Sequence, residues 1–254
     1  MNALFVAWRA SDNSGGVWGP VGRLHFDGQL YWFCYTQGAR KLQGFRPFSP
    51  MDDLDQVYAS ETLFPLFANR LLSPSRPEYE AFLRWGGFDP NNPPTPLAIL
   101  GVTEGIRQTD SIEVFPCPTP DAEGCYLNKF FLHGIRWMPT NALERIDQLQ
   151  RGQQLILWPE PLNVADRNAV AVCTVFEPTQ IGYVPRYLAH DVGRLLQECS
   201  FVELVVEQLN RDAPLQQRLL CCMRSCWPPE FRPCSGADFL PIPADVPTTC
   251  EALS

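Results

Sequence analysis

Residues 160–170 have the sequence Glu-Pro-Leu-Asn-Val-Ala-Asp-Arg-Asn-Ala-Val, and residues 181–186 have the sequence Ile-Gly-Tyr-Val-Pro-Arg. The first stretch is rich in Asn, Asp and Pro, which favour turns because their side chains bond nearby backbone groups or fix φ. Short apolar runs follow at 169–176 and 179–184, a pattern typical of strands. We therefore predict a polar loop between two strands.

Further short apolar runs surround this loop. They predict strands at 126–134, 154–158 and 201–208, and a short helix at 141–150. Residues 185–197 place Leu188, Val192 and Leu195 on one face of a second helix. Several short strands with one or two helices favour a small closed barrel, because closure removes exposed strand edges. We place this barrel at residues 125–212.

The remainder of the chain predicts a smaller N-terminal α+β domain at residues 1–88. It contains a strand at 4–8, a hairpin of 18–26 and 30–36 with the tight-turn dipeptide Asp27-Gly28, and helices at 60–72 and 77–84. Residues 89–124 are a Pro-rich linker and extension with strands at 97–102 and 111–115. Residues 213–254 are a tail that packs on the surface. The predicted class is α+β and β-rich.

A third stretch, Gly-Ile-Arg-Trp at residues 134–137, lies at the end of the predicted strand 126–134. In order and spacing, the three stretches resemble the HIRAN domain over about a third of the chain. The most specific part is the run acidic-Pro-x-Asn-x-x-Asp-x-Asn-Ala followed by Ile-Gly-Tyr-Val. This resemblance implies an OB-like barrel that captures the 3′ end of single-stranded DNA.

The resemblance also implies roles for individual residues. Arg136 and Trp137 match an Arg-aromatic pair in which the aromatic ring stacks on the terminal base and the Arg contacts the backbone. Asp166 matches a carboxylate that accepts a hydrogen bond from the 3′-hydroxyl. A carboxylate repels phosphate, so Asp166 would favour an unphosphorylated end, and an exposed ring contributes about 1–3 kcal/mol per stacked base.

Five further positions complete the predicted site. Leu162 and Asn163 match a loop that touches the sugar-phosphate, and Arg186 matches a basic position near the phosphates. Ala165 stands where the family usually has an aromatic residue, and Tyr183 stands where it has a His. The departure at Ala165 implies that one stacking contact is missing and that affinity is weaker than in the family pattern.

Each of these residues also has a structural alternative. Asn163 and Asp166 could cap a turn between two strands, as Asn and Asp commonly do. Asn168 and Ala169 fit the same turn. Trp137 could belong to the core, although its neighbours Arg136 and Pro139 favour the mouth of the barrel equally.

The charge of the chain limits how it could bind nucleic acid. The 254 residues carry a formal net charge of −8, with 20 Lys and Arg against 28 Asp and Glu. Coating a duplex needs a dense basic face. Arginine suits a few fixed contacts to phosphate. The composition therefore excludes broad, nonspecific DNA binding and permits a site that grips a few nucleotides.

Ten cysteines raise the question of disulfides or zinc. The start of the chain lacks the pattern of a secretory signal, so we expect a cytoplasmic protein with free, mostly buried thiols and no disulfide. No pair of cysteines has the spacing of a zinc knuckle. We expect no cofactor. The one cluster that could hold zinc consists of Cys221, Cys222, Cys226 and Cys234.

The first segment offers a weaker resemblance. Its stretches at 22–31, 45–48 and 64–72 resemble the N-terminal region of HipA-type toxin kinases, but the sequence contains no phosphate-binding Gly loop. This resemblance implies an accessory module that contacts a partner or supports the barrel.

Three hypotheses follow. The first is a non-catalytic protein that binds single-stranded DNA ends in repair, replication or defence, with a helicase, nuclease or other repair protein as partner and no membrane association. The second is a protein-interaction module. The third is a zinc-containing hydrolase or nuclease component that uses the cysteine cluster.

Overall fold

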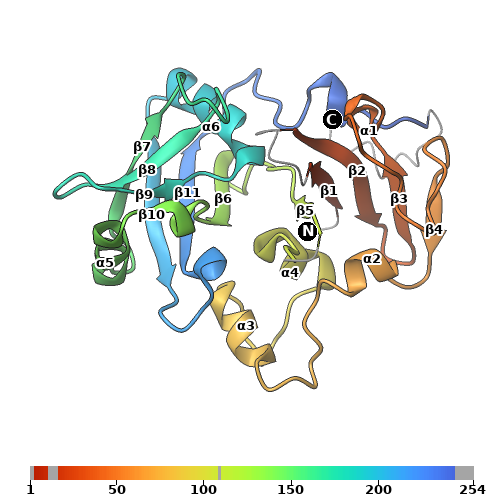
Figure 1. Cartoon of the computed structure of the whole chain (residues 1–254), viewed down its shortest axis with the longest axis horizontal. Coiled ribbons are helices and arrows are strands. Elements are labelled where there is room, and N and C mark those ends of the chain that lie inside the picture. The colour runs from red at the N-terminus through yellow and green to blue at the C-terminus, as the bar shows by residue number, and fades with distance from the viewer. Residues whose placement is uncertain (1–2, 11–16, 108–109, 244–254) are drawn as a thin grey trace. The chain divides into compact units, whose positions relative to one another are not determined.

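The computed structural model describes residues 3–10, 17–107 and 110–243. The chain divides into two compact units, each built from separate stretches of sequence. Unit 1 comprises Met1–Arg76, Pro94–Cys117 and Arg232–Ser254, and unit 2 comprises Pro77–Pro93 and Pro118–Phe231 (Figure 1). In the described part of the chain, no helix combines the length and apolar character that a membrane crossing requires.

Unit 1 contains one five-stranded antiparallel sheet with the order β4-β3-β2-β1-β5. The predicted hairpin forms, because the Asp27 side chain accepts hydrogen bonds from the backbone N–H groups of Gln29 and Leu30, both at 2.8 Å. The rings of Phe33, Tyr35 and other aromatic residues pack on one side of the sheet. The strands are β1 (Ala3–Arg9), β2 (Trp18–Phe26), β3 (Tyr31–Tyr35), β4 (Tyr58–Ser60) and β5 (Ile112–Phe115).

The helices of unit 1 correct two predictions. They are α1 (Gln37–Lys41), α2 (Pro65–Ala68), α4 (Pro96–Thr103) and the short 3-10 helix η3 (Ala237–Phe239). The predicted helix 60–72 is reduced to α2. The predicted strand 97–102 is wrong, because the Thr95 hydroxyl caps the N-terminus of α4 by accepting a hydrogen bond from the N–H of Ala98 at 3.3 Å. A short apolar run fits a buried strand and a buried helix equally well.

Unit 2 contains a six-stranded antiparallel sheet with the order β6-β11-β10-β7-β8-β9. Just beyond β6, His133 pairs with Tyr183 of β9 through two backbone hydrogen bonds of 2.9 Å. The first and last strands of the sheet therefore meet at this bridge, and the predicted α+β, β-rich fold with a small barrel is confirmed. The strands are β6 (Cys125–Phe131), β7 (Gln154–Pro159), β8 (Val170–Thr174), β9 (Gln180–Tyr183), β10 (Val202–Leu209) and β11 (Leu219–Cys226).

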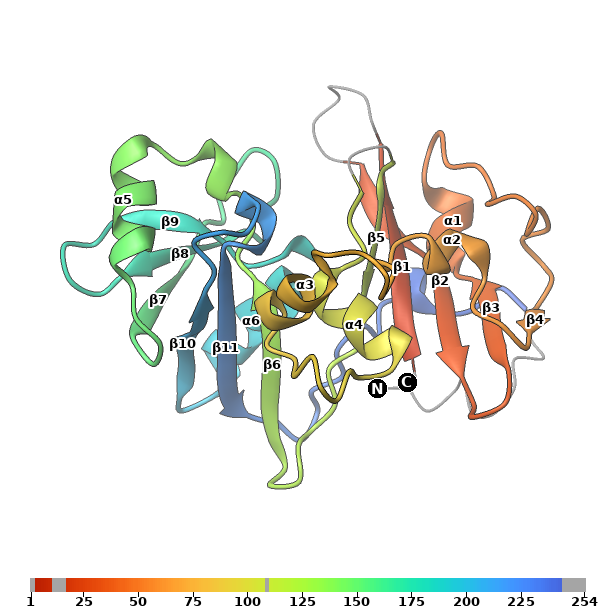
Figure 2. The ribbon, with the colours of Figure 1, turned by 90° about the horizontal axis from the view of Figure 1, so that it is seen from below.

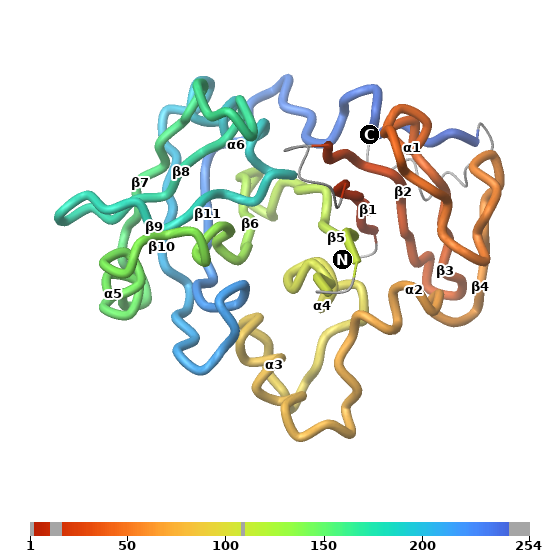
Figure 3. Tube along the Cα trace, viewed as in Figure 1, coloured from red at the N-terminus to blue at the C-terminus, as the bar shows by residue number. Residues whose placement is uncertain are grey.

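Helices cover parts of this barrel. They are α3 (Tyr79–Trp85), the 3-10 helix η1 (Ile135–Trp137), α5 (Thr140–Gln148), α6 (Arg186–Glu198) and the 3-10 helix η2 (Leu215–Gln217). The predicted stripe of α6 is confirmed, since Leu188, Val192 and Leu195 are buried. α5 lies against β9 (Figure 2). The chain path can be followed in Figure 3 from β6 through α5 to α6, and then to β11.

β11 is one of the strands that form the barrel, and it lies between β6 and β10 in the sheet. The prediction of a surface tail from residue 213 is therefore wrong for 219–226. Cys221, Met223 and Ser225 are buried and Arg224 is exposed, which is the alternation of a strand. A cysteine-rich stretch hides this signal, because cysteine suggests metal ligands as readily as it suggests a small buried hydrophobic residue.

Helix α3 belongs to unit 2, although the sequence suggested that residues 77–88 are part of the N-terminal domain. The side chain of Gln208 donates to the carbonyl of Arg84 at 2.8 Å, and that of Asn210 donates to the carbonyl of Trp85 at 3.0 Å. These long-range hydrogen bonds attach α3 to the end of β10. No local sequence pattern reports such contacts.

After residue 231, the chain returns to unit 1. The Sγ of Cys117, where the chain leaves unit 1, lies 3.5 Å from the carbonyl oxygen of Pro233, where the chain returns. The point of departure and the point of return are thus neighbours within unit 1.

The expectation that the chain has no disulfide is wrong. Cys199 and Cys226 form a disulfide, with Cα atoms 5.8 Å apart and a sequence separation of 27. Because β10 and β11 pair antiparallel with Val202 opposite Ser225, the residues just before β10 and at the end of β11 come together. This proximity arises from strand pairing, which sequence spacing alone does not show.

The cysteine cluster does not gather into a metal site. In the described part of the chain, no three His, Cys, Asp or Glu residues are placed to hold a metal ion. Cys226 is in the disulfide, Cys221 is buried and its neighbour Cys222 is half-exposed, as expected for successive residues of one strand. Burial raises the pKa of the Cys221 thiol well above its usual range.

Candidate nucleic-acid interface

The Arg136–Trp137 pair stands on the surface of the barrel. Gly134 adopts a positive φ of 76° and starts η1, and the N–H of Trp137 bonds back to its carbonyl at 2.9 Å. This turn leaves Trp137 73% exposed, so the alternative in which Trp137 is a core residue is wrong. The guanidinium carbon of Arg136 lies 4.6 Å from the centre of the Trp137 ring, a cation–π contact.

The loop at 160–169 is shaped by Asn163. Its side-chain oxygen accepts hydrogen bonds from the N–H groups of Ala165 at 3.0 Å and Asp166 at 3.2 Å. Its side-chain amide donates to a carboxylate oxygen of Glu160 at 2.8 Å. Asn163 therefore has the turn-forming role that was one of the two alternatives. Its contribution to a ligand site is to fix the loop.

The tip of this loop is apolar. Leu162 is 93% exposed and Val164 is 103% exposed relative to the reference state. Ala165 is exposed beside them and offers no ring, in agreement with the sequence. Because the Asn163 hydrogen bonds hold the loop, two aliphatic side chains are presented to solvent on a defined turn.

Asp166 makes a turn contact, and its carboxylate also remains partly exposed at the surface. One carboxylate oxygen accepts a hydrogen bond from the N–H of Asn168 at 2.9 Å, which is a turn contact. The other lies 3.4 Å from Nε of Arg186, at the first residue of α6. Both side chains remain partly exposed. Arg186 thereby holds one Asp166 oxygen at the surface without removing it from solvent.

Tyr183 connects the three stretches. Its backbone forms the bridge to His133, directly before η1, and a side chain at Gly134 would meet its ring at 3.1 Å. Its hydroxyl donates to the Glu160 carboxylate at 3.2 Å. Tyr183 therefore contacts η1 on one side and the 160–169 loop on the other.

These contacts place the predicted residues on elements that meet at Tyr183, and we call this set of residues the terminal site. It consists of Arg136 and Trp137 on η1, the loop residues Leu162, Asn163, Ala165 and Asp166, and Tyr183 and Arg186. The sequence prediction missed Glu160, which binds both Asn163 and Tyr183. Glu160 is the acidic first residue of the 160–169 motif, and this position could have indicated its role from the sequence.

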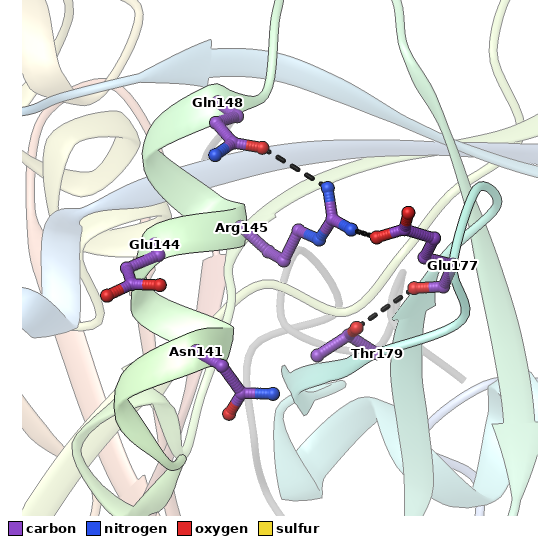
Figure 4. Close-up of a pocket in the computed structure, with 6 residues that line it drawn as sticks. All are labelled: Asn141, Glu144, Arg145, Gln148, Glu177 and Thr179. Atoms are coloured by element: carbon purple, nitrogen blue, oxygen red, sulfur yellow. Dashed lines mark hydrogen bonds and ion pairs between the residues drawn. The ribbon is translucent and has the colours of Figure 1, made fainter.

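A separate polar groove lies between α5 and the turn before β9. In Figure 4, Arg145 of α5 points toward Glu177, and the two form an ion pair. Arg145 also donates to Gln148 at 3.2 Å. The groove is lined by Asn141, Glu144, Arg145, Gln148, Glu177 and Thr179 and shares no residue with the terminal site.

Comparisons with known proteins found a matching family model and similar solved structures. Residues 127–221 match the family model of the HIRAN domain. A protein from Lactobacillus plantarum of known crystal structure is 21% identical, with a TM-score of 0.34, over 40% of this chain and 97% of that one. The HIRAN domain of human HLTF is 16% identical, with a TM-score of 0.32, over 52% of this chain and 89% of that one.

No curated protein matches the chain. The resemblance of the first segment to HipA-type toxin kinases is not supported. The matched residues, 127–221, include all of the terminal site and the first three residues of β11, which the predicted boundary at 212 excluded. The part of this chain from 127 to 221 therefore matches the HIRAN domain family.

Proposed function

We propose that the terminal site binds the 3′ end of single-stranded DNA and performs no chemistry on it. The HIRAN match supports DNA binding. The observation that carries the finer proposal is Trp137, a 73% exposed ring held beside Arg136 at the barrel surface. We place the activity in DNA repair, replication or defence, with a helicase or nuclease as partner.

Each residue has a physical role in this proposal. Trp137 offers a π face to the last base, a contact that tolerates any sequence. Arg136 and Arg186 supply positive charge for the phosphates. Asp166, held by Arg186, accepts a hydrogen bond from a free 3′-hydroxyl and repels a 3′-phosphate. Asn163 and Glu160 hold the loop that touches the sugar-phosphate.

The test is fluorescence anisotropy with the full chain and 5′-labelled oligonucleotides that end in a 3′-hydroxyl or a 3′-phosphate. We expect the hydroxyl end to bind more tightly. We expect Trp137→Ala to weaken binding by about 1–3 kcal/mol, since one stacked base is lost. Phe176→Ala is the matched control, because Phe176 is also an exposed ring of unit 2.

A second variant separates end recognition from general affinity. Asp166→Asn keeps the oxygen that bonds Asn168 but removes the charge. We expect it to lose the preference for the hydroxyl end. Asp147→Asn, at an exposed carboxylate on α5, is the control. Equal affinity of the unmodified protein for both ends would contradict the proposal.

The apolar loop tip favours one second candidate, a protein-interaction module. Leu162 and Val164 are fully exposed on a fixed turn. In that case, the double variant Leu162→Ser, Val164→Ser would lose a copurifying protein while keeping its affinity for DNA. Loss of DNA affinity in this variant would instead indicate that the loop tip contacts DNA.

A further inference from the structure

The strand register aligns a row of side chains across the barrel. Trp158 of β7 lies opposite Ala171 of β8, and Ala171 lies opposite Tyr183 of β9. Tyr183 in turn faces His133 through the closing bridge. Residues directly opposite in antiparallel strands point to the same face of a sheet. Trp158 and the Tyr183 of the terminal site therefore share one face, with the small, buried Ala171 between them.

The row continues on the other side of β7. Leu204 of β10 pairs with Leu155 of β7. Leu155 is buried, and an odd offset along β7 reverses the face, so Trp158 points outward. Phe201 directly precedes β10, three residues before Leu204, and its ring is also exposed. Their exposed fractions agree, at 63% for Trp158 and 46% for Phe201.

A second observation ties this face to the terminal site. Glu160, two residues after Trp158, contributes to the raised pKa of the Cys173 thiol, although burial is the larger cause. Cys173 is two residues from Ala171 on β8 and lies opposite Ile156, two residues before Trp158. The carboxylate that holds the Tyr183 hydroxyl is therefore close to the same outer face.

We propose that a DNA strand held by its 3′ end at the terminal site continues over Trp158 and Phe201, which stack on its upstream bases. This proposal rests on the proposed function and extends the ligand from one terminal nucleotide to a short single strand. Two strand spacings separate Trp158 from Tyr183, about 10 Å. That distance corresponds to about three nucleotides at 3.4 Å each.

The charges near the row indicate which part of the strand it contacts. Glu203 is exposed and, two residues from Phe201 on an extended strand, points to the same face. Arg224 of β11 lies directly opposite Glu203 and offsets its charge, so this part of the face offers no net positive charge to phosphates. The row then contributes by stacking, and its contribution is insensitive to salt.

The experiment compares 5′-labelled (dT)2 and (dT)8, both with a free 3′-hydroxyl, on the full chain. We expect Trp158→Ala to weaken (dT)8 on the order of tenfold and to leave (dT)2 within about twofold. Trp158→Phe keeps a ring and should restore most of the affinity. We expect the salt dependence of (dT)8 binding to be the same in Trp158→Ala and the unmodified protein.

The outcomes separate the two proposals. Trp137→Ala should weaken both lengths, and Phe176→Ala should weaken neither. If Trp158→Ala binds (dT)8 as the unmodified protein does, or weakens both lengths equally, the row does not extend the site. If the unmodified protein binds neither oligonucleotide, the proposal that the terminal site binds DNA ends is wrong. Unchanged thermal unfolding of each variant shows that the exposed positions report binding.

Discussion

At the scale of single residues, Gly182 is the position where β9 comes closest to the chain beyond β6. A Cβ atom there would lie 2.6 Å from the carbonyl oxygen of His133 and 2.7 Å from Cγ of Leu132. The neighbouring Tyr183 makes the bridge that joins the two edge strands. The barrel is therefore able to close because residue 182 has no side chain.

We expect Gly182→Ala to lower the free energy of unfolding by about 1–3 kcal/mol, because the backbone must move to relieve the overlap. Gly193→Ala is the control: it lies inside α6, where a Cβ meets nothing within 4 Å. That change should add up to about 1 kcal/mol by helix propensity. Urea unfolding measures both, and equal effects of the two variants would contradict the closure argument.

His25 is a second residue with a defined consequence. It is buried, and within the described part of the chain neither ring nitrogen has a hydrogen-bond partner. Burial lowers its pKa below the usual value of 6.5, and Asp27 opposes this effect weakly. The unfolded chain therefore binds a proton at a higher pH than the folded chain does.

The stabilising contribution of neutral His25 is complete above pH 6.5 and is lost as the pH falls below that value. We expect the melting temperature to fall between pH 7.5 and pH 5.5, and to fall less in His25→Leu. An equal fall in the unmodified protein and in His25→Leu would contradict this assignment. Thermal unfolding at several pH values measures the fall in melting temperature for both proteins.

At the scale of elements, the disulfide ties the end of α6 to the end of β11. Closing a loop of this length stabilises the fold by about 3–4 kcal/mol in the chain-entropy model. We expect Cys199→Ser to lose stability of that order under oxidising conditions. Dithiothreitol should destabilise the unmodified protein equally and leave Cys199→Ser unchanged, with Cys173→Ser as a free-thiol control.

The elements also show how far the sequence determines the fold. α6 could be predicted because its apolar residues repeat at helical spacing. The hairpin of unit 1 could be predicted because Asp27-Gly28 suits a tight turn. α4 could not, because its apolar run has no period. β11 could not, because its place between β6 and β10 depends on pairing across long sequence separations.

The candidate site shows the same limit. The residue types and their order could be predicted from three short motifs. The partners could not: Arg186 beside Asp166, and Glu160 between Asn163 and Tyr183, are contacts made by the closed barrel. The turn that begins at Gly134 leaves Trp137 exposed, where composition left a core position open.

At the scale of the whole molecule, a net charge of −8 limits the electrostatic part of DNA binding. If Arg136 and Arg186 contact two phosphates, log K should fall with log salt at a slope of about −1.4. We expect a slope between about −1 and −2 from titrations at several salt concentrations. A slope steeper than about −5 would indicate a broad basic surface and contradict a small terminal site.

The contact between Cys117 and Pro233 has a consequence for the arrangement of the chain. All five strands of the unit 1 sheet come from residues before 116, and the chain departs from and returns to that unit at adjacent points. Residues 118–231 are therefore arranged as an insertion, whereas α3 belongs to the separate stretch 77–93 of unit 2. Loss of residues 118–231 would separate no pair of strands in the sheet of unit 1, but it would remove the hydrogen-bond partners of α3 on Gln208 and Asn210.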